Sequence, residues 1–266
     1  MQEKSIAELY ILMVEPSKSQ AKFIHRELKN AGITHFDVAI NGQSSLDVMT
    51  QFKPDLVISA MHLPDMTATE LVYKMREDEN LKDVAFMLIS SETGFDYIDP
   101  IKQAGVTGIL PKPFKSEQLK RGLYNTLDIL NPDALELGDF KAEDLKVLIV
   151  DDSTMARNHI KRVLKGLGIE DITEADDGAS AVPLLDEHFF DFVVTDYNMP
   201  KMDGKALLEH IRSRSNQRSI PVLMVTSEGN MGNLAAVEQA GVSGICDKPF
   251  ESDTVRALIQ TMMADV

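Results

Sequence analysis

Five polar residues in the second half of this chain stand directly after, or at the end of, short apolar runs of the kind that form buried strands. They are Asp151, Asp152, Asp196, Thr226 and Lys248. Three carboxylates brought close together repel one another by roughly several kcal/mol per pair unless a cation is present or one takes up a proton. Mg²⁺ suits such a set, because it prefers carboxylate, carbonyl and water oxygens. A lysine and a threonine hydroxyl opposite suit a phosphoryl group attached to one of the carboxylates.

Short strands alternating with amphipathic helices must bring these residues together. The apolar runs of the second half are at 147–150, 172–175, 192–195, 222–226 and 244–246. Helical patterns lie at 154–166, 178–187, 204–213, 233–240 and 252–263. Fully apolar strands that alternate with helices predict a parallel sheet covered on both faces, which is a doubly wound α/β domain. Residues at the carboxyl ends of such strands gather in one crevice, where we expect the chemistry.

The first half of the chain repeats this pattern at a constant offset of 136 residues. VISAMHLPDM at 57–66 matches VVTDYNMPKM at 193–202, but the first run ends its strand on Ala60 where the second has Asp196. The offset predicts two copies of one five-stranded domain joined by an acidic linker. The expected domains are 1–130 and 145–266, and the expected linker is 131–144.

Composition and charge narrow the function classes. The chain has 266 residues, of which 44% are hydrophobic, and no apolar run approaches the length of a membrane span. We therefore expect a cytoplasmic protein. The formal charge of −15 opposes binding to nucleic acid or to an anionic membrane. The single cysteine, Cys246, is interpreted as a core thiol, and the six histidines show no metal-ligand spacing.

The motifs VLIVDDS, VVTDYNMPKMDG, VTSEG and DKPF together resemble the receiver domain of bacterial two-component response regulators. The resemblance implies a five-stranded parallel sheet flanked by five helices, with Asp196 as the phosphoacceptor. It implies a Mg²⁺ site made by Asp151, Asp152, Asp196 and the backbone carbonyl of Asn198. It also implies that Thr226 and Lys248 bind the phosphoryl oxygens, and that the Lys248-Pro249 peptide bond is cis.

Taken singly, these residues have simpler explanations. Asp152 or Ser153 would cap the following helix, Asp196 would hold a turn, and Lys248 would be a solvated charge. All of them together at one edge of an apolar sheet favour a phosphoacceptor site.

Three further positions bear on signal lifetime and on switching. Asn198 and Glu228 border the approach of water to the acceptor in receiver-like sites, and the same residue types occur in the chemotaxis response regulators, which implies a fast-resetting signal. The switch position on strand five holds Ile245 where the family uses an aromatic residue, so the aromatic half of the family's relay is missing.

The first copy resembles a receiver that has lost its acceptor, a pseudo-receiver. It keeps a hydroxyl and a lysine but replaces the acid pair and the acceptor. The counterparts in the first copy are Glu15, Pro16, Ala60, Ser90 and Lys112. His62, in the place of Asn198, and Ser90 are alternative acceptors, but neither has the carboxylate cluster that positions Mg²⁺. Pro16 suits the first turn of a helix, so the substitution preserves the fold while removing a metal ligand.

By resemblance, a histidine kinase or a histidine phosphotransfer protein phosphorylates Asp196, and the altered face of helix 4, strand 5 and helix 5 contacts an unknown effector, the other domain or a second copy. The last predicted helix ends near Val266, so we expect no separate output domain. The protein is expected to be a signalling protein rather than an enzyme. The alternatives are a phosphate sink or phosphorelay intermediate, and a structural adaptor with a vestigial site.

Overall fold

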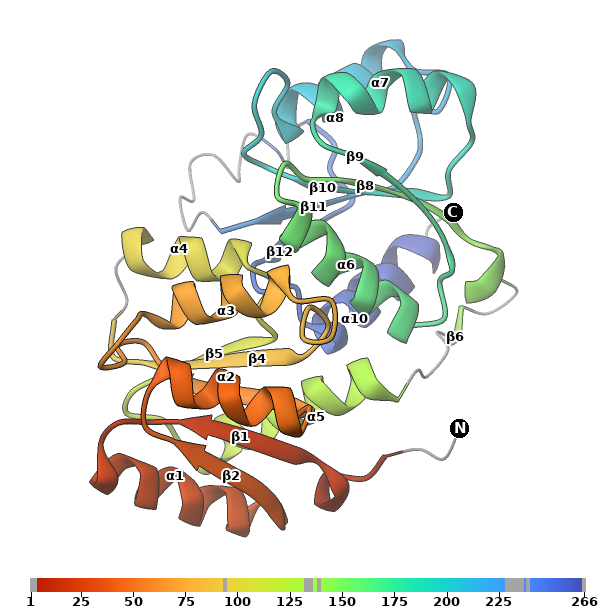
Figure 1. The fold of residues 1–266 in the computed structure, drawn as a ribbon. Coiled ribbons are helices and arrows are strands. Elements are labelled where there is room, and N and C mark those ends of the chain that lie inside the picture. The colour runs from red at the N-terminus through yellow and green to blue at the C-terminus, as the bar shows by residue number, and fades with distance from the viewer. Residues whose placement is uncertain are drawn as a thin grey trace. The chain divides into compact units, whose positions relative to one another are not determined.

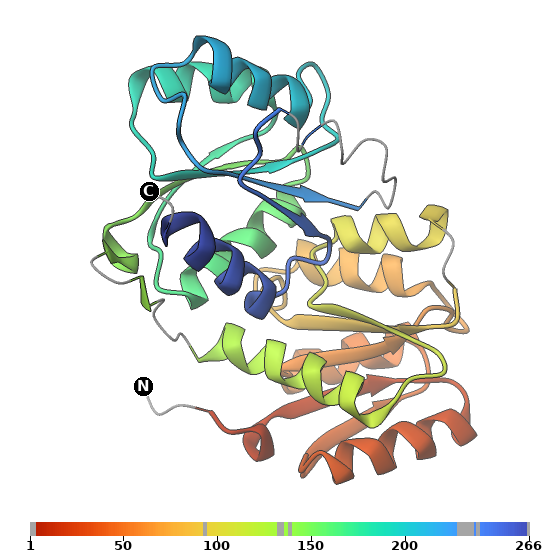
Figure 2. The same cartoon turned by 180° about the vertical axis from the view of Figure 1, so that it is seen from behind.

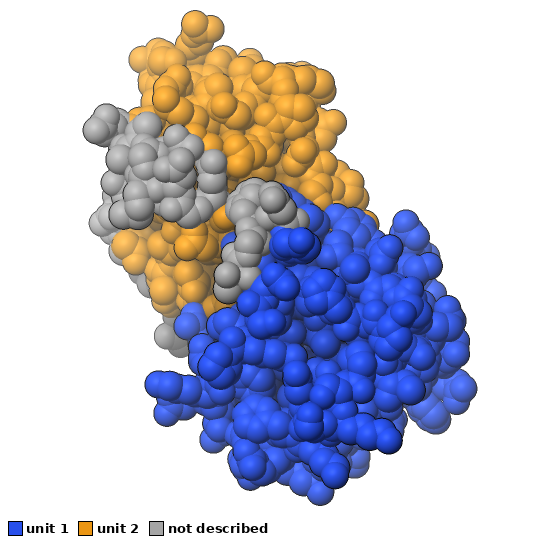
Figure 3. Space-filling model, turned by 90° about the vertical axis from the view of Figure 1, so that its left-hand side faces the viewer, with its two compact units in different colours: residues 1–131 blue, residues 132–266 orange. Residues whose placement is uncertain are grey.

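The chain forms two units, each built on its own parallel sheet. The computed structural model describes residues 4–92, 95–131, 136–137, 140–227, 237 and 240–264. The units are Met1–Asn131 and Pro132–Val266 (Figure 3). Each contains a five-stranded sheet in which all neighbouring strands are parallel. The predicted fold class, two doubly wound α/β domains, is confirmed.

The first unit has the strand order β2-β1-β3-β4-β5 (Figure 1). Its strands are β1 (Tyr10–Val14), β2 (His35–Ala39), β3 (Leu56–Ala60), β4 (Ala85–Ser90) and β5 (Gly108–Pro111). Its helices are η1 (Ile6–Glu8), α1 (Lys18–Asn30), α2 (Gly42–Gln51), α3 (Ala68–Glu77), α4 (Phe95–Gln103) and α5 (Ser116–Leu130). The central strands β3 and β4 are buried along their whole length, as expected for a sheet covered on both faces.

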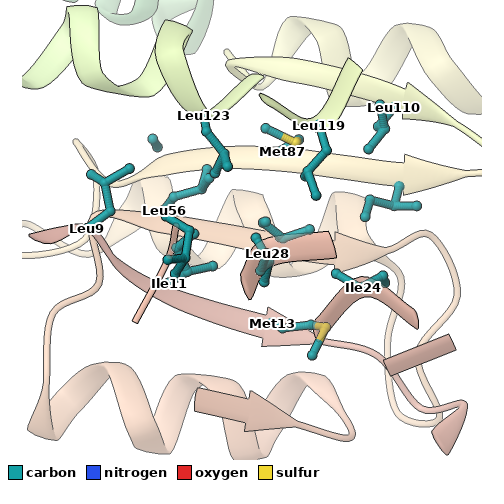
Figure 4. Close-up of a cluster of buried hydrophobic side chains, with 14 of the residues drawn as sticks. Leu9, Ile11, Met13, Ile24, Leu28, Leu56, Met87, Leu110, Leu119 and Leu123 are labelled. Carbon is teal, nitrogen blue, oxygen red and sulfur yellow. The ribbon is translucent and has the colours of Figure 1, made fainter. Parts of the chain in front are cut away.

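One face of the first sheet is covered by α1 and α5, as Figure 2 shows from behind. Figure 4 shows Ile24 and Leu28 of α1 and Leu119 and Leu123 of α5 among the side chains of this core. Met87 reaches it from β4. The first unit therefore keeps a packed core, although it has Ala60 where the second unit has the predicted acceptor Asp196.

The second unit repeats the order as β9-β8-β10-β11-β12. Its strands are β8 (Lys146–Val150), β9 (Asp171–Ala175), β10 (Phe192–Asp196), β11 (Val222–Thr226) and β12 (Gly244–Asp247). Its described helices are α6 (Thr154–Gly166), α7 (Gly178–Glu187), α8 (Gly204–Arg214) and α10 (Ser252–Ala264). Side chains of α7 and α8 pack on one face of the sheet, and α6 and α10 lie on the other (Figure 1). The helix expected at 233–240 lies outside the described residues except for Val237 and Ala240.

The stretch predicted to be a linker contains regular structure. Two short strands, β6 (Glu136–Leu137) and β7 (Phe140–Lys141), pair antiparallel and are followed by the 3₁₀ turn η2 (Ala142–Asp144). None of the helices among the described residues is long and apolar enough to cross a membrane.

Candidate functional site

Two adjacent central strands bring the carboxylates of the second unit together. Thr195 of β10 is in register with Val150 of β8, so Asp151 and Asp196 occupy neighbouring positions at the carboxyl end of the sheet. Asp152 follows at the start of the β8–α6 loop. One oxygen from each of these three side chains lies within 4.8 Å of the others. Asp151 and Asp196 are buried, whereas Asp152 is exposed.

Lys248 lies between the two buried carboxylates. Its Nζ is 2.9 Å from Oδ2 of Asp151 and 3.0 Å from Oδ1 of Asp196, and its side chain is only 3% exposed. The lysine is therefore no solvated surface charge. Its backbone N–H donates to the carbonyl of Thr226 at 2.7 Å, which joins the two predicted phosphoryl-binding residues through the main chain. The Lys248-Pro249 bond is cis, as expected.

The charges at this edge do not balance. Burial raises the pKa of Asp196 to about 6, with the Asp151 and Asp152 charges adding to the rise and Lys248 opposing it. Burial likewise raises the pKa of Asp151. Burial alone would lower the pKa of Lys248, but the two carboxylates outweigh it and raise it. Lys248 is thus one cation beside three carboxyl groups. The excess of negative charge favours the binding of a further cation at this edge of the sheet.

The donor set fits a hard divalent cation. Oδ2 of Asp196 is buried and has no hydrogen-bond partner among the described residues. A buried carboxylate oxygen without a donor is costly unless a cation or a proton satisfies it. Oxygen ligands from Asp151, Asp152 and Asp196 in one cluster match the preference of Mg²⁺.

Local contacts fix the loops around the cluster. Ser153 accepts a hydrogen bond from the N–H of Ala156 and so caps α6, while its own N–H donates to Oδ1 of Asp151 at 2.8 Å. Ser153, rather than Asp152, is therefore the cap. Gly204 is needed at the start of α8, because a Cβ there would lie 2.1 Å from the carbonyl oxygen of Asp196.

The remaining predicted residues lie around this cluster. Thr226 is buried at the end of β11, Asn198 is exposed in the loop after Asp196, and Ile245 is half-buried on β12 against the core. Glu228 lies outside the described residues. Cys246 is buried, as expected for a core thiol, and burial raises its pKa to about 12.

The matching edge of the first unit is chemically different. Nζ of Lys112 is 3.3 Å from Oε2 of Glu15 and also donates to the side chain of Gln20. Ser90 Oγ accepts a hydrogen bond from the N–H of Glu92, and a pocket of about 280 Å³ borders Ala60. Among the described residues, Asp151, Asp152 and Asp196 form the one cluster of acids and histidines suited to a metal ion.

One group beside the cluster was not foreseen from the sequence. Arg157 on α6 donates from Nη1 to the backbone carbonyl of Asp151 at 2.6 Å, and its Nε is 3.3 Å from Oε2 of Glu174. Lys161 also contacts the Glu174 carboxylate. A comparison of the two copies of the repeat could have identified these residues. The offset places Ala21 opposite Arg157 and Val38 opposite Glu174 in the copy that lacks the acids.

The family model for the response regulator receiver domain matches residues 11–123 and again residues 147–260. The chain therefore belongs to the response regulator receiver family and carries two copies of the domain. The resemblance inferred from the sequence motifs is confirmed.

Individual relatives agree with this membership. The chain is 44% identical over 114 residues to the chemotaxis protein CheY-3 of Vibrio cholerae, which covers 43% of this chain and 88% of that protein. It is 42% identical over 122 residues to the chemotaxis protein CheY of Pseudomonas aeruginosa, covering 46% of this chain and 98% of that protein. A receiver domain of a sensor histidine kinase from Pseudomonas aeruginosa, described with a magnesium ion in its active-site cleft, is 26% identical, with a TM-score of 0.42 and coverage of 45% and 98%.

The raised pKa of Asp196 has a consequence for stability. A carboxyl whose folded pKa lies above its unfolded value favours the fold below pH 4, and this contribution is lost as the pH rises through about 6. Without Mg²⁺ at pH 7, Asp196→Asn is therefore expected to raise the free energy of unfolding by about 2 to 3 kcal/mol. At pH 4 the difference should nearly vanish. Urea unfolding at both pH values measures it.

Asp186→Asn, at an exposed position of α7, is the matched control because it makes the same change of charge away from the cluster. It should alter stability at neither pH. Equal stability of Asp196→Asn and wild type at pH 7 would contradict the raised pKa.

Proposed function

We propose that the second unit is a receiver domain phosphorylated on Asp196 in a Mg²⁺-dependent reaction, and that it signals by changing its contacts with another protein. The observation that carries this proposal is the cluster of Asp151, Asp152 and Asp196 with Lys248 between the two buried acids. A structural network would satisfy its charges internally. This one leaves a buried acceptor oxygen of Asp196 without a hydrogen-bond donor among the described residues.

The proposed metal ligands are Asp151, Asp152, Asp196 and the backbone carbonyl of Asn198. When bound, Mg²⁺ would neutralise the carboxylates and withdraw charge from the phosphoryl oxygens. The chain itself supplies the acceptor and the groups that hold the phosphoryl group. Lys248 is positioned to stabilise its negative charge, and Thr226 presents a hydroxyl donor.

The transfer is a displacement at phosphorus. A carboxylate oxygen of Asp196 forms a bond to the phosphorus atom, and the bond from phosphorus to the donor's leaving group breaks. The leaving group departs with the electron pair and takes up a proton from solvent. We propose a histidine kinase or a histidine phosphotransfer protein as the donor, with the phosphohistidine nitrogen as the leaving group, and the cytoplasm as the compartment.

The first unit is proposed to be a pseudo-receiver that accepts no phosphoryl group. Ala60 offers no nucleophile, and Pro16 offers no side-chain ligand in place of Asp152. Lys112 is held by Glu15 and Gln20 instead of by an acceptor. Its proposed role is to bind a partner or the second unit.

Restoring the acceptor alone should not restore the site. In an Asp196→Ala background, Ala60→Asp is expected to give no labelling by acetyl phosphate and Mg²⁺, because the second acid of the metal site is still missing. Intact mass spectrometry measures the label. Ready labelling of the double variant would show that Glu15 and Pro16 suffice to hold the metal.

The lifetime of the phosphorylated state depends on water. Asn198 is exposed beside the acceptor, where its amide can orient a water molecule for attack on phosphorus without blocking it. Asn198→Arg is expected to lengthen the lifetime about tenfold, which corresponds to about 1.4 kcal/mol in barrier. Glu228→Lys is expected to act in the same direction.

The decay of label after removal of free donor measures this lifetime. Glu187→Arg, at the exposed end of α7, is a control for added charge on the same unit and should decay like wild type. Unchanged decay in both site variants would remove Asn198 and Glu228 from the proposed role. Slow decay of the wild type would favour storage or relay over a fast-resetting signal.

Output is proposed to pass through the face of β12, α10 and the helix expected from the sequence at 233–240, with Ile245 on β12 as the switch position. Capture of partners by the full chain with beryllofluoride and Mg²⁺ tests this, with Asp196→Ala as control. A partner retained only by the treated wild type supports a switch. Turnover of phosphate without any such partner supports a phosphate sink or relay.

A further inference from the structure

Arg157 connects three parts of the second unit that meet beside the carboxylate cluster. Its Nη1 donates to the carbonyl of Asp151 at 2.6 Å, and its Nη2 donates to Oγ1 of Thr154 at 3.1 Å. Its Nε pairs with Oε2 of Glu174 on β9 at 3.3 Å. The Arg157 side chain is 14% exposed, so these contacts are largely shielded from water.

The carbonyl that Arg157 holds belongs to the peptide bond joining Asp151 to Asp152. Asp151 is also fixed by its N–H to the carbonyl of Ala175 and by its side chain. Asp152 is exposed, and its Cα is bonded to the nitrogen of that peptide, so a rotation of the peptide would move its side chain relative to the cluster. A guanidinium bound to the peptide carbonyl restricts its rotation and keeps Asp152 aimed at the cluster.

The degenerate copy lacks every charged member of this group. Ala21 stands opposite Arg157, His25 opposite Lys161 and Val38 opposite Glu174. Val38 is 46% exposed on β2, so this strand forms with an apolar residue at the position that Glu174 occupies in the second unit. The first unit keeps its core without the group, so the fold does not require it. The copy that has the acid cluster also has Arg157 and Glu174, and the copy that lacks the cluster lacks both. This pattern favours a role for the two residues in the site rather than in the fold.

We propose that Arg157, held by Glu174, is a positioning residue that sets the affinity of the acid pair for Mg²⁺. It acts through the Asp151 carbonyl and touches neither the metal nor the phosphoryl group. The inference rests on the proposed function of the cluster. Removing the group that orients a metal ligand typically weakens metal binding about tenfold or more.

Calorimetric titration of the full chain with Mg²⁺ tests this positioning role. Arg157→Ala is expected to weaken binding about tenfold. Arg157→Lys is expected to restore part of the affinity, because lysine keeps a charged donor group but lacks the planar fork of the guanidinium. The concentration of Mg²⁺ that gives half-maximal labelling by acetyl phosphate should rise by the same factor. The labelling rate at saturating Mg²⁺ should stay near that of wild type, which a disrupted acceptor site would not allow.

Two further variants keep the test decisive. Glu174→Gln leaves Arg157 in place without its charged partner and should weaken Mg²⁺ binding less than Arg157→Ala does. Lys161→Ala removes the other cation on Glu174 without touching the Asp151 carbonyl, and should bind Mg²⁺ like wild type. Thermal unfolding of each variant reports whether it is folded.

The outcomes separate the two proposals. Wild type that binds no Mg²⁺ at the second unit would overturn the proposed function. Wild type that binds Mg²⁺, with Arg157→Ala and Glu174→Gln binding equally well, would overturn the positioning role alone. Equal losses in Arg157→Ala and Lys161→Ala would also overturn it, because the effect would then follow the charge rather than the carbonyl contact.

Discussion

The Asp196→Ala chain is expected to take up no phosphoryl group from acetyl phosphate and Mg²⁺ under conditions that label wild type. Asp196 is the one acid that ends a central strand of either sheet and also contacts a buried lysine among the described residues. Removing it deletes the nucleophile, so the loss should be complete rather than partial. Intact mass spectrometry of the full chain over a time course measures it.

Asp186→Ala, at an exposed position of α7, is the matched control and should be labelled like wild type. Labelling that survives in Asp196→Ala would mean that another residue accepts the phosphoryl group, and it would contradict the assignment. His62 and Ser90 of the first unit are the residues to test next in that case.

Lys248→Met is expected to have the second largest effect, because it removes the cation between two buried acids. Labelling should fall by about 10²- to 10³-fold, as when an enzyme loses a group that stabilises developing charge. Without Mg²⁺ at pH 7, the free energy of unfolding should fall by about 3 to 5 kcal/mol, the usual effect of removing one partner of a buried ion pair.

The loss of stability should shrink at pH 4, where Asp196 is protonated in the folded protein because burial raises its pKa to about 6. Lys112→Met makes the same change in the first unit, where the lysine is 25% exposed, and should leave labelling unchanged. Urea unfolding and mass spectrometry give the two readouts. Equal stability of Lys248→Met and wild type at pH 7 would refute the role of Lys248 in the cluster.

The described helices of the second unit were predictable to within about a residue because strong local signals mark their ends. The expected helices at 154–166 and 178–187 match α6 and α7. Each begins directly after a side chain that caps it, Ser153 in one case and Asp177 in the other. The strands were predictable because their apolar runs are continuous, as a sheet covered on both faces requires.

The hairpin of β6 and β7 was missed for a physical reason. Each strand has two residues, which is too short for any periodicity, and the surrounding acids and Pro132 are typical of a linker. The stability of such a hairpin depends on what it packs against, which the local sequence does not reveal.

The candidate site was predictable in its side chains but not in its backbone contacts. Asp151, Asp196 and Lys248 could be grouped because parallel strands place their carboxyl ends at one edge. The contact of Arg157 with a peptide carbonyl could not be predicted from residue spacing, because a long side chain on the first turns of α6 can adopt many conformations. The raised pKa of Asp196 could not be predicted from the sequence either, because burial contributes more to it than the neighbouring charges do.

The central claim is that one of the two receiver copies accepts a phosphoryl group and that the acceptor is Asp196. The most direct measurement labels the wild-type chain with acetyl phosphate and Mg²⁺, counts the labels by intact mass, and reduces the acyl phosphate with borohydride to mark the acceptor. We expect one label per chain and a single modified residue, Asp196. Two labels per chain, or a modified residue in the first unit, would contradict the account.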